Sequence, residues 1–477
     1  MKKFYVTTSI AYVNAPPHIG FALEAAQADV LARYHRERGF DVFFLTGTDE
    51  HGVKIVRAAE TAGISPQKFV DENSAKFRAL KETLNLSWDD FVRTSDQKRH
   101  WPNAQKIWKA IEKSGDLYKK NYRGHYCVGH EAFITEKDLI DGKCRDHKQK
   151  PEIIEEENWF FKLSKYSKDI KKLIEKGDLE ILPESRKNEI LSFLNEGLED
   201  ISFSRPKKDL SWGVPVPGDP DSVMYVWADA LVNYLLPEKY WPADIHVIGK
   251  DILRFHAAIW PGMLLSAGLK LPKKIFVHGF ITVDGEKMSK TVGNVVEPDA
   301  LVKKYSVDAV RYYLLREIPS GDDGDYSEEK FKERYNGDLA NGLGNFASRV
   351  LALGEKLGEI KADPKKTDKA IAKKIEEVKE VVNKKIYEYK LHEALAAIWD
   401  LISYGDVYVN NEKPWDKSVT GIQRQASIVN AIVILDNVAA FLKPFLPETA
   451  EKITKSITWS SKNTLQVKKS ENLFPRI

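Results

Sequence analysis

The chain has 477 residues, more than one hydrophobic core normally supports, so we expect two or three domains. A hydrophobic share of 43% beside 30% charged residues excludes a disordered or membrane-embedded protein and predicts a soluble fold. The formal net charge of +3 is too mild to identify a nucleic-acid partner by charge alone.

The start of the chain and its two cysteines bear on the cellular compartment. Residues 1–9 include lysines but no apolar stretch comes before Asn14, so we expect no signal peptide. We also expect no membrane span, because no run of the sequence is long and apolar enough. Cys127 and Cys144 are too few for a disulfide scaffold and suit a reducing compartment, which predicts a cytoplasmic protein.

Strands and helices alternate at the start of the chain. One helix is expected from His18 to about Arg38, and another from Ile252 to about Ala267. Four runs are expected to form buried strands: Phe4–Thr8, Val42–Thr46, Ile245–Ile248 and Ile275–His278. Strand, helix and strand at this spacing form a βαβ unit, so we predict a Rossmann-like parallel sheet with ligands at the carboxyl ends of its strands.

The rest of the chain differs in character. Residues 116–220 are charged and irregular and contain turn signals, which predicts a domain inserted between two halves of the sheet. Beyond about residue 330, apolar residues recur at three- and four-residue steps, which predicts an all-helical bundle. The recurring residues are Ile371, Ile375, Val378, Val382, Ile386, Leu391, Leu395, Ile398 and Ile402.

The first candidate motif is His18-Ile19-Gly20, at the expected start of the first helix. A helix N-terminus offers unpaired N–H groups and a positive dipole end, so an imidazole there would face a bound anion. Gly20 leaves room for a phosphate or a base. Taken alone, the tripeptide more often holds a surface histidine without function.

The second candidate motif follows the strand that ends at His278. It reads Asp284-Gly285-Glu286-Lys287-Met288-Ser289-Lys290-Thr291, a glycine-marked loop with two lysines three residues apart. The alternative interpretation is a solvated basic loop. A His-Ile-Gly helix start paired with a distant Lys-Met-Ser-Lys loop, each beside a strand of one α/β sheet, resembles the signature of class I aminoacyl-tRNA synthetases.

The resemblance implies a reaction that these residues suit. In amino acid activation the substrate's own carboxylate attacks the α-phosphate of ATP and expels pyrophosphate, so the protein stabilises charge and supplies no nucleophile. His18, Lys287 and Lys290 would be the catalytic residues, which stabilise the phosphates of ATP with Mg²⁺. Gly20 and Asp251 would complete the ATP site, with Asp251 at the ribose, unless that carboxylate caps the following helix.

One position departs from the family's pattern. The first motif usually ends in a second histidine, and this chain has Phe21, which cannot donate to a phosphate. A catalytically inactive, tRNA-binding relative therefore stays open as an alternative. Class I enzymes for leucine, isoleucine or valine carry a large editing insertion for which 477 residues leave no room, and the cysteine enzyme binds its substrate through zinc.

From residue 3 to about 450 the chain is similar to methionyl-tRNA synthetases, in stretches such as Thr46–Gly52 and Tyr225–Ala230. The similarity implies that Asp49 pairs with the substrate ammonium, a charge-assisted contact. It places seven residues around the methionine side chain: Ile10, Tyr12, Trp227, Ala230, Tyr234, Ile252 and His256. Aromatic rings suit a thioether, although such residues are core residues by default, and Leu231 stands where the family often has proline.

A possible metal site lies in the expected insertion. Cys127 and His130 are separated by two residues, as are Cys144 and His147, which is the spacing of a tetrahedral zinc knuckle with two thiolates and two imidazoles. The methionyl family has a cysteine-rich knuckle here, and His130 replaces one of its cysteines. The zinc would be structural, because four protein ligands fill its coordination; the alternative is two hairpin turns without metal.

The expected helical region contains residues that resemble the anticodon-binding helix of the same family. Asn345 and Arg349 are four residues apart, on one helical face, and offer amide and guanidinium donors to base edges. Trp415 would stack on an unpaired anticodon base, although a tryptophan after a proline is as often a packed corner.

The resemblance implies the activity of a class I methionine–tRNA ligase with the substrates L-methionine, ATP and methionine tRNA. The expected architecture is an α/β, Rossmann-like catalytic domain with an inserted connective domain that holds the zinc knuckle, followed by an all-α anticodon-binding bundle. The expected bounds are 1–115 and 221–270 for the catalytic halves, 116–220 for the insertion, 271–330 for the lysine loop with a stem-contact region, and 331–477 for the bundle. We expect a monomer with no membrane partner, since no dimerisation module follows the bundle.

Overall fold

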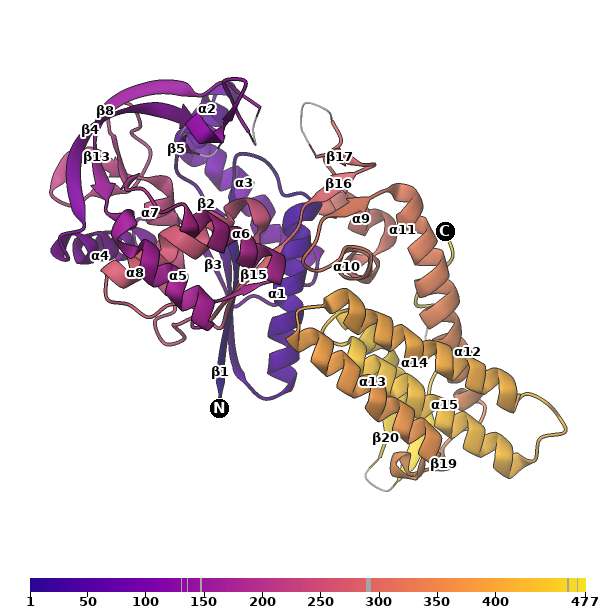
Figure 1. Ribbon diagram of the computed structural model, residues 1–477. Helices are drawn as coiled ribbons and strands as arrows, with labels where there is room; N and C mark the ends of the chain where they lie inside the picture. Colours follow the sequence, from indigo (N-terminus) through magenta and orange to yellow (C-terminus); the bar gives the residue numbers. More distant parts are fainter. Residues whose placement is uncertain (130, 135, 146–147, 289–292, 461–462, 470) are drawn as a thin grey trace. The chain divides into compact units, whose positions relative to one another are not determined.

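The computed structural model describes residues 1–477 except 130, 135, 146–147, 289–292, 461–462 and 470 (Figure 1). The chain forms two compact units. The first unit comprises Met1–Pro17, Gly39–Leu80 and Trp88–Val277, and the second comprises His18–Arg38, Lys81–Ser87 and His278–Ile477. The four domain bounds expected from the sequence remain predictions.

A six-stranded sheet forms the centre of the first unit, with the strand order β3-β2-β1-β14-β15-β9. β1 pairs in parallel with both β2 and β14, which confirms the predicted parallel sheet. The strands are β1 (Lys3–Tyr12), β2 (Asp41–Asp49), β3 (Asp90–Arg93), β9 (Glu180–Leu182), β14 (Ile245–Gly249) and β15 (Lys274–His278). β9 comes from the range expected to be the insertion, so part of that range belongs to the central sheet.

Helices of the first unit bury apolar faces in one hydrophobic core with this sheet. Tyr5 and Ile275 from the strands contact a cluster that includes Trp108, Ile174 and Trp260. The helices are α2 (Val53–Thr61), α3 (Pro66–Thr83, which continues into the second unit), α4 (His100–Lys113), α5 (Ser167–Lys176), α6 (Glu184–Asn195), α7 (Val226–Ala230) and α8 (Trp260–Ser266). The helix predicted from Ile252 to about Ala267 is present, and it contains a π-helical segment, Phe255–Ile259, before α8.

Smaller sheets of the first unit are built from the expected insertion (Figure 1). The longest pair is antiparallel, between β4 and β8, and a four-stranded sheet has the order β10-β8-β4-β5. The strands are β4 (Leu117–Cys127), β5 (Ala132–Ile134), β6 (Leu139–Ile140), β7 (Lys143–Cys144), β8 (Glu152–Phe161), β10 (Ile201–Ser202), β11 (Ser204–Pro206), β12 (Pro215–Val216) and β13 (Asp219–Met224).

The second unit combines α1 (Ile19–Glu37), a small sheet and a helical bundle. The sheet has the order β17-β16-β18 and consists of β16 (Ile281–Val283), β17 (Glu286–Lys287) and β18 (Gly324–Tyr326). The helices are α9 (Pro298–Tyr305), α10 (Val307–Arg316), α11 (Glu328–Arg334), a π-helix (Tyr335–Gly344), α12 (Asn345–Glu355), α13 (Lys369–Tyr387), α14 (Leu391–Glu412), α15 (Gly421–Leu442) and α16 (Pro447–Ser456). A third sheet holds β19 (Ile360–Lys361), β20 (Ile457–Trp459) and β21 (Thr464–Val467).

The predicted bundle is confirmed, because all nine apolar residues singled out in α13 and α14 are buried. α15 packs against α12, α13, α14 and α16. By length and composition α15 is apolar enough to cross a membrane, so the expectation that no segment meets this test is wrong. Its buried residues, Ile432 and Leu435 among them, make it the central helix of the bundle, which accounts for its apolar composition.

Candidate active site

His18 is the N-cap residue of α1. Its backbone is extended, with φ −123° and ψ 173°, and its Nδ1 atom accepts a hydrogen bond of 3.0 Å from the N–H of Gly20. Because Nδ1 serves as an acceptor, the ring proton of the neutral imidazole lies on Nε2. His18 is exposed, so Nε2 is a hydrogen-bond donor available to a ligand at the helix N-terminus.

A side chain at residue 20 would displace the His18 ring. A Cβ atom at this position would lie 2.7 Å from Cε1 and 2.9 Å from Nδ1 of the His18 ring, closer than carbon atoms tolerate. The absence of a side chain at residue 20 therefore keeps the His18 ring over its own helix N-terminus.

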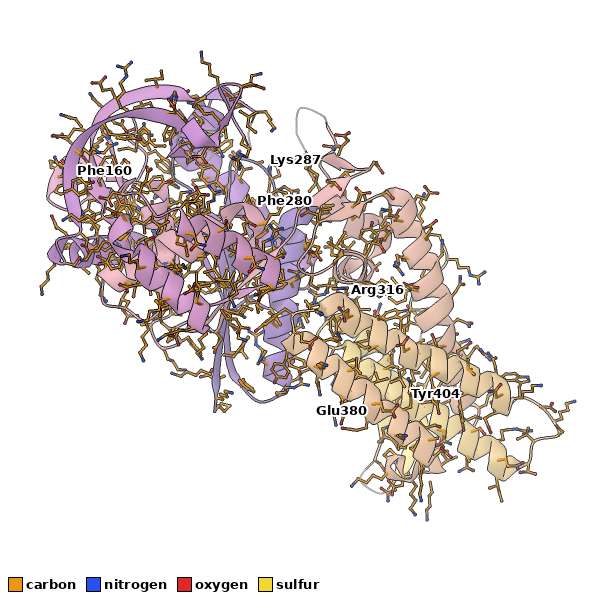
Figure 2. The ribbon with its side chains drawn as sticks, viewed as in Figure 1. Phe160, Phe280, Lys287, Arg316, Glu380 and Tyr404 are labelled. Atoms are coloured by element: carbon orange, nitrogen blue, oxygen red, sulfur yellow. The ribbon has the colours of Figure 1, made fainter. Side chains whose placement is uncertain are left out.

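Lys287 lies in the hairpin formed by β16 and β17 (Figure 2). The two strands are antiparallel and are joined by Asp284-Gly285, whose φ values of 51° and 80° identify a tight turn with both central residues left-handed. Lys287 is exposed, and its ammonium lies 5.6 Å from the centroid of the Phe280 ring. The cation is accessible, and among the described residues it makes this weak contact, so it can move to a ligand.

Within the second unit, the two predicted motifs lie side by side. The N–H of Ile19 donates to the carbonyl oxygen of Val296 at 3.0 Å, and a Cβ atom at Gly20 would lie 3.8 Å from Cε of Met288. The structure thus brings the start of α1 to both flanks of the lysine loop. Lys290 lies outside the described residues.

Buried ion pairs fix α1 against the elements that carry the loop. Glu24 of α1 contacts Nε2 of His278 at 2.9 Å, and His278 ends the strand before the hairpin. Asp29 of α1 pairs at 2.8 Å with Arg311 of α10, and both side chains are fully buried. Arg311 also donates to the carbonyl oxygen of Phe445 at 2.8 Å, so its charge is solvated by protein groups.

Six of the eight residues predicted around methionine line one small cavity of the first unit, with a volume of about 10 Å³. These are Ile10, Asp49, Trp227, Ala230, Tyr234 and His256. Tyr12 and Ile252 are half-buried and do not line it. Ser9 and Asn233, which no motif identified, also line the cavity together with Leu231. Their adjacency to Ile10 and Tyr234 is the signal that could have identified them.

Asp49 gives the cavity its charge. It is 3% exposed at the end of β2, and among the described residues its Oδ1 atom has no hydrogen-bond partner. Burial raises the pKa of Asp49 well above its usual range, and the charge of nearby Asp229 raises it further. A buried carboxylate with an unpaired oxygen suits a cationic ligand, which would offset its desolvation.

A buried network ties Asp49 to α7. Asp229 accepts from Nδ1 of His51 at 2.8 Å and contacts Nε2 of His100 at 2.9 Å. All three side chains are buried, and although burial opposes ionisation, the two histidines lower the pKa of Asp229 below its usual value. Because His51 is two residues after Asp49 and Asp229 is next to Ala230, this network fixes the spacing between two walls of the cavity.

Aromatic side chains form the apolar part of the cavity. Trp227 stacks on Phe255 with ring centroids 3.9 Å apart and an interplanar angle of 10°. Tyr234 and Nε2 of His256 are 2.8 Å apart, and Nδ1 of His256 donates to the carbonyl oxygen of Ile252 at 3.0 Å. The second contact places the ring proton on Nδ1, so the hydroxyl of Tyr234 donates to Nε2. Ile252 thus acts through His256, and Asp251, in the 3₁₀ turn Lys250–Ile252, is exposed.

The two cysteines of the predicted metal site come together. Cys127 ends β4, Cys144 ends β7, and both are buried in one small cluster with Ile134, against which Leu139 packs. His130 and His147 lie outside the described residues. The structure therefore brings together two of the four predicted ligands. Among the residues that are described, no group of three or more ligand side chains is arranged to hold a metal ion.

The predicted anticodon residues lie at the start of α12 and beyond α14. Asn345 is exposed, and Arg349 donates to Asp406 at 2.6 Å and to Asn410 at 2.7 Å. The Arg349 guanidinium lies 5.4 Å from the centroid of the Trp415 ring, which is 51% exposed. This surface presents a flat ring beside a fixed cation.

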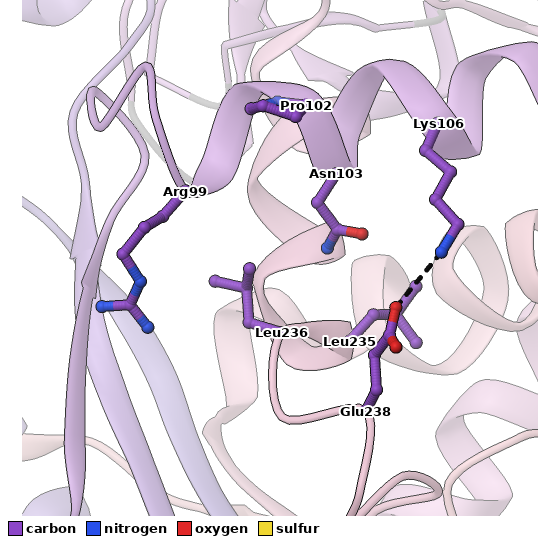
Figure 3. A pocket seen from close by; sticks show the side chains of 7 residues that line it. All are labelled: Arg99, Pro102, Asn103, Lys106, Leu235, Leu236 and Glu238. Carbon is purple, nitrogen blue, oxygen red and sulfur yellow. Dashed lines mark hydrogen bonds and ion pairs between the residues drawn. The ribbon is translucent and has the colours of Figure 1, made fainter.

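A larger cavity of about 260 Å³ opens elsewhere in the first unit, between α4 and the segment after Tyr234 (Figure 3). Lys106 pairs with Glu238 across it at 3.1 Å, and Arg99 at its edge pairs with Asp90 at 2.6 Å. Since each cation has a carboxylate partner, this cavity offers less to a charged ligand than the site at Asp49.

Comparisons with known proteins match these features. A family model described as tRNA synthetases class I (M) matches residues 4–145 and 134–351, and a model of the anticodon-binding domain of tRNA ligase matches residues 368–474. Methionine–tRNA ligase of Brucella suis is 44% identical over 471 residues, which cover 95% of this chain and 91% of that protein. Methionine–tRNA ligase of Thermotoga maritima is 42% identical over 480 residues, which cover 96% and 76%.

A solved structure gives the same result. Mycobacterium tuberculosis methionyl-tRNA synthetase in complex with methionyl-adenylate is 39% identical, with a TM-score of 0.93 over 100% of both chains. The similarity therefore covers the sheet, the inserted segment and the helical bundle together.

Proposed function

Because this chain belongs to the methionyl-tRNA synthetases of class I, we propose that its Asp49 cavity binds L-methionine and that the segments around His18 and Lys287 bind ATP. As a methionine–tRNA ligase, the chain activates methionine with ATP to methionyl adenylate and transfers it to methionine tRNA. The contact of the α1 N-terminus with the flanks of the lysine loop, through Val296 and Met288, supports the ATP site most directly.

Asp49 would pair with the methionine ammonium and so offset its own burial. The thioether would lie against Trp227, Tyr234 and His256, where a polarizable sulfur gains contact with aromatic rings. Ile10 and Ala230 would complete the apolar wall. Tyr12 and Ile252 do not line the cavity and would contact methionine only after the wall moves. Since the cavity is only about 10 Å³, methionine binding requires side chains of this wall to move.

In the activation step, the methionine carboxylate attacks the α-phosphate of ATP, and pyrophosphate leaves. His18 would donate from Nε2 to the phosphates, and Lys287 and Lys290 would neutralise charge that develops on the leaving pyrophosphate. Gly20 would let the phosphates approach the helix, and Asp251 would bind the ribose. Mg²⁺ bound to the phosphates of ATP would neutralise part of their charge.

The bundle would read the tRNA. Asn345 and Arg349 would donate to base edges of the anticodon, and the exposed ring of Trp415 would stack on one base. The ion pair of Arg349 with Asp406 would hold the guanidinium in place beside that ring.

The inserted segment would hold one structural zinc ion through Cys127, His130, Cys144 and His147. The proximity of the two buried thiols supports this site, because thiolates are the ligands that zinc prefers. When bound, the metal would stiffen a segment with little core of its own. Metal analysis of the purified protein tests the proposal: stoichiometric zinc is expected, and a fully active protein without zinc would contradict it.

We further propose that the protein is a monomer in the cytoplasm. Light scattering would measure its molar mass, and a stable dimer would contradict the monomer.

Methionine-dependent exchange of pyrophosphate with ATP tests the function. Exchange is expected with methionine and not with leucine, isoleucine, valine or cysteine, followed by charging of methionine tRNA. Exchange with another amino acid would replace the assignment, and tRNA binding without any exchange would identify an inactive relative in which Phe21 has cost activity.

Replacement G20A is expected to lower the exchange rate by about tenfold or more, because the added methyl group displaces the His18 ring from the phosphates. Exchange kinetics at saturating methionine measure this effect. G421A is the matched control, since a Cβ atom at Gly421, at the start of α15, meets open space. Equal rates for the two variants would show that the position of His18 does not matter.

Methionine affinity is expected to fall at acidic pH. The ammonium binds the ionised carboxylate, and burial together with Asp229 raises the pKa of Asp49 in the cavity. As the pH falls through that raised pKa, Asp49 becomes protonated and must lose its proton before it can bind the methionine ammonium. The KM for methionine therefore rises by up to about tenfold per pH unit. Exchange assays from about pH 8 to about pH 5 measure it. A KM that stays constant across this whole range, as for an aspartate with its usual pKa, would contradict the prediction.

A further inference from the structure

Glu131 is a buried carboxylate of the inserted segment that none of the roles above uses. It is 4% exposed and follows β4 in the turn that leads to β5. Its backbone has φ 53°, in the left-handed region that favours glycine, which strains a glutamate. A buried carboxylate needs hydrogen-bond donors that offset its desolvation.

The Glu131 carboxylate has three donors, and they come from different parts of the first unit. The Tyr126 hydroxyl donates to Oε2 at 2.6 Å, and the backbone N–H of Lys54 donates to Oε1 at 2.5 Å. The Tyr12 hydroxyl lies 2.9 Å from the same Oε1. Lys54 also donates from Nζ to the carbonyl oxygen of Gly129, so the turn that bears Glu131 is fixed at two points.

Tyr12 connects this carboxylate with the methionine cavity. It pairs with Asp49 across β1 and β2, and it follows Ile10, which lines the cavity, by two residues. Its hydroxyl also lies 2.8 Å from the carbonyl oxygen of His51, so its single proton is shared between Glu131 and the turn after Asp49. Glu131 is thus one of two acceptors that fix the orientation of the Tyr12 ring.

Gly52 allows these groups to approach. Its φ is 102°, and a Cβ atom there would lie 2.7 Å from the Tyr12 hydroxyl and 3.1 Å from Oε1 of Glu131. A side chain at this position would separate the tyrosine from the carboxylate. The backbone of the Asp49 turn is therefore shaped to let the inserted segment reach Tyr12.

We propose that Glu131 is a positioning residue, which holds the Tyr12 ring beside the methionine cavity and so makes methionine affinity depend on the inserted segment. The proposal rests on the assignment of that cavity to methionine. The carboxylate does not contact the substrate; it acts through the Tyr12 hydroxyl, and its effect is on binding rather than on the chemical step.

The test compares variants in methionine-dependent exchange and in direct methionine binding by calorimetry, which requires no catalysis. E131A is expected to raise the KM and Kd for methionine by about tenfold, the loss of a hydrogen bond to a charged group, with kcat within about twofold of wild type. E131Q keeps an acceptor for the Tyr12 hydroxyl and is expected to restore affinity to within about threefold. E131G is expected to resemble E131A in affinity, since glycine relieves the backbone strain but lacks the carboxylate.

A double-mutant cycle separates positioning from a general structural role. The double variant Y12F/E131A is expected to bind methionine no more weakly than the weaker-binding single variant. Each substitution removes the same contact, between the Tyr12 hydroxyl and the Glu131 carboxylate. Y118F is the matched control, since Tyr118 donates to Asp200 at 2.9 Å within the same β4–β8 sheet, and it is expected to leave methionine affinity unchanged.

Wild-type affinity in both E131A and E131G would overturn the proposal, and so would effects of E131A and Y12F that multiply in the double variant. A wild-type protein that neither binds methionine nor exchanges pyrophosphate would instead refute the proposed function. If wild type binds and E131A does not differ from it, only the role of Glu131 is wrong.

Discussion

D49N is expected to raise the KM for methionine by roughly 10- to 150-fold while the KM for ATP stays within about twofold of wild type. The amide keeps the shape of the carboxylate but has no charge to pair with the ammonium, and an Asn Nδ2 group repels it as a donor. Exchange assays with each substrate varied in turn measure both constants.

Stability separates this effect from misfolding. At neutral pH the buried carboxylate of Asp49, whose pKa is raised, opposes folding, so D49N is expected to unfold at the same or a higher temperature than wild type. D90N is the control variant and is expected to leave the KM for methionine unchanged, because Asp90 pairs with Arg99 and does not line the methionine cavity. Unchanged methionine KM in D49N would remove Asp49 from the binding site.

K287A is expected to lower kcat for exchange by roughly 100- to 1,000-fold, the loss of one donor that stabilises charge in the transition state. Lys287 is exposed and contacts Phe280 weakly, so the variant is expected to unfold at the wild-type temperature. Single-turnover formation of methionyl adenylate measures the chemical step directly.

The control for K287A is K303A. Lys303 is also an exposed lysine of the second unit, on α9, where it pairs with Asp299 in the same helix. K303A is expected to retain the wild-type rate. Equal rates in K287A and K303A would mean that the loop lysine at 287 is not catalytic.

The sequence predicted helices and strands correctly where apolar residues repeat on a buried face. The three- and four-residue steps of α13 and α14 identified their buried residues, and the apolar runs identified β1, β2, β14 and β15. β9 escaped prediction because a strand of three residues has no period to read. The π-helix at Phe255–Ile259 escaped because its apolar sequence is the same as that of an ordinary helix.

The site was predictable where short motifs carry it, as at His18 and around Trp227. Contacts between distant residues were not predictable, since no local pattern encodes them. Asp229 meets His51 and His100 across 178 and 129 residues, and Glu131 meets Tyr12 across 119. Such partners become visible only when the fold brings them together.

His18 and the lysine loop, far apart in sequence, are expected to bind one triphosphate. A crystal structure with methionine and a non-hydrolysable ATP analogue measures this most directly. Phosphate oxygens are expected within about 3.2 Å of Nε2 of His18 and of the ammonium of Lys287 or Lys290. Phosphates that contact neither segment would contradict this expectation. Phosphates that contact the start of α1 but not the lysine loop would also contradict it.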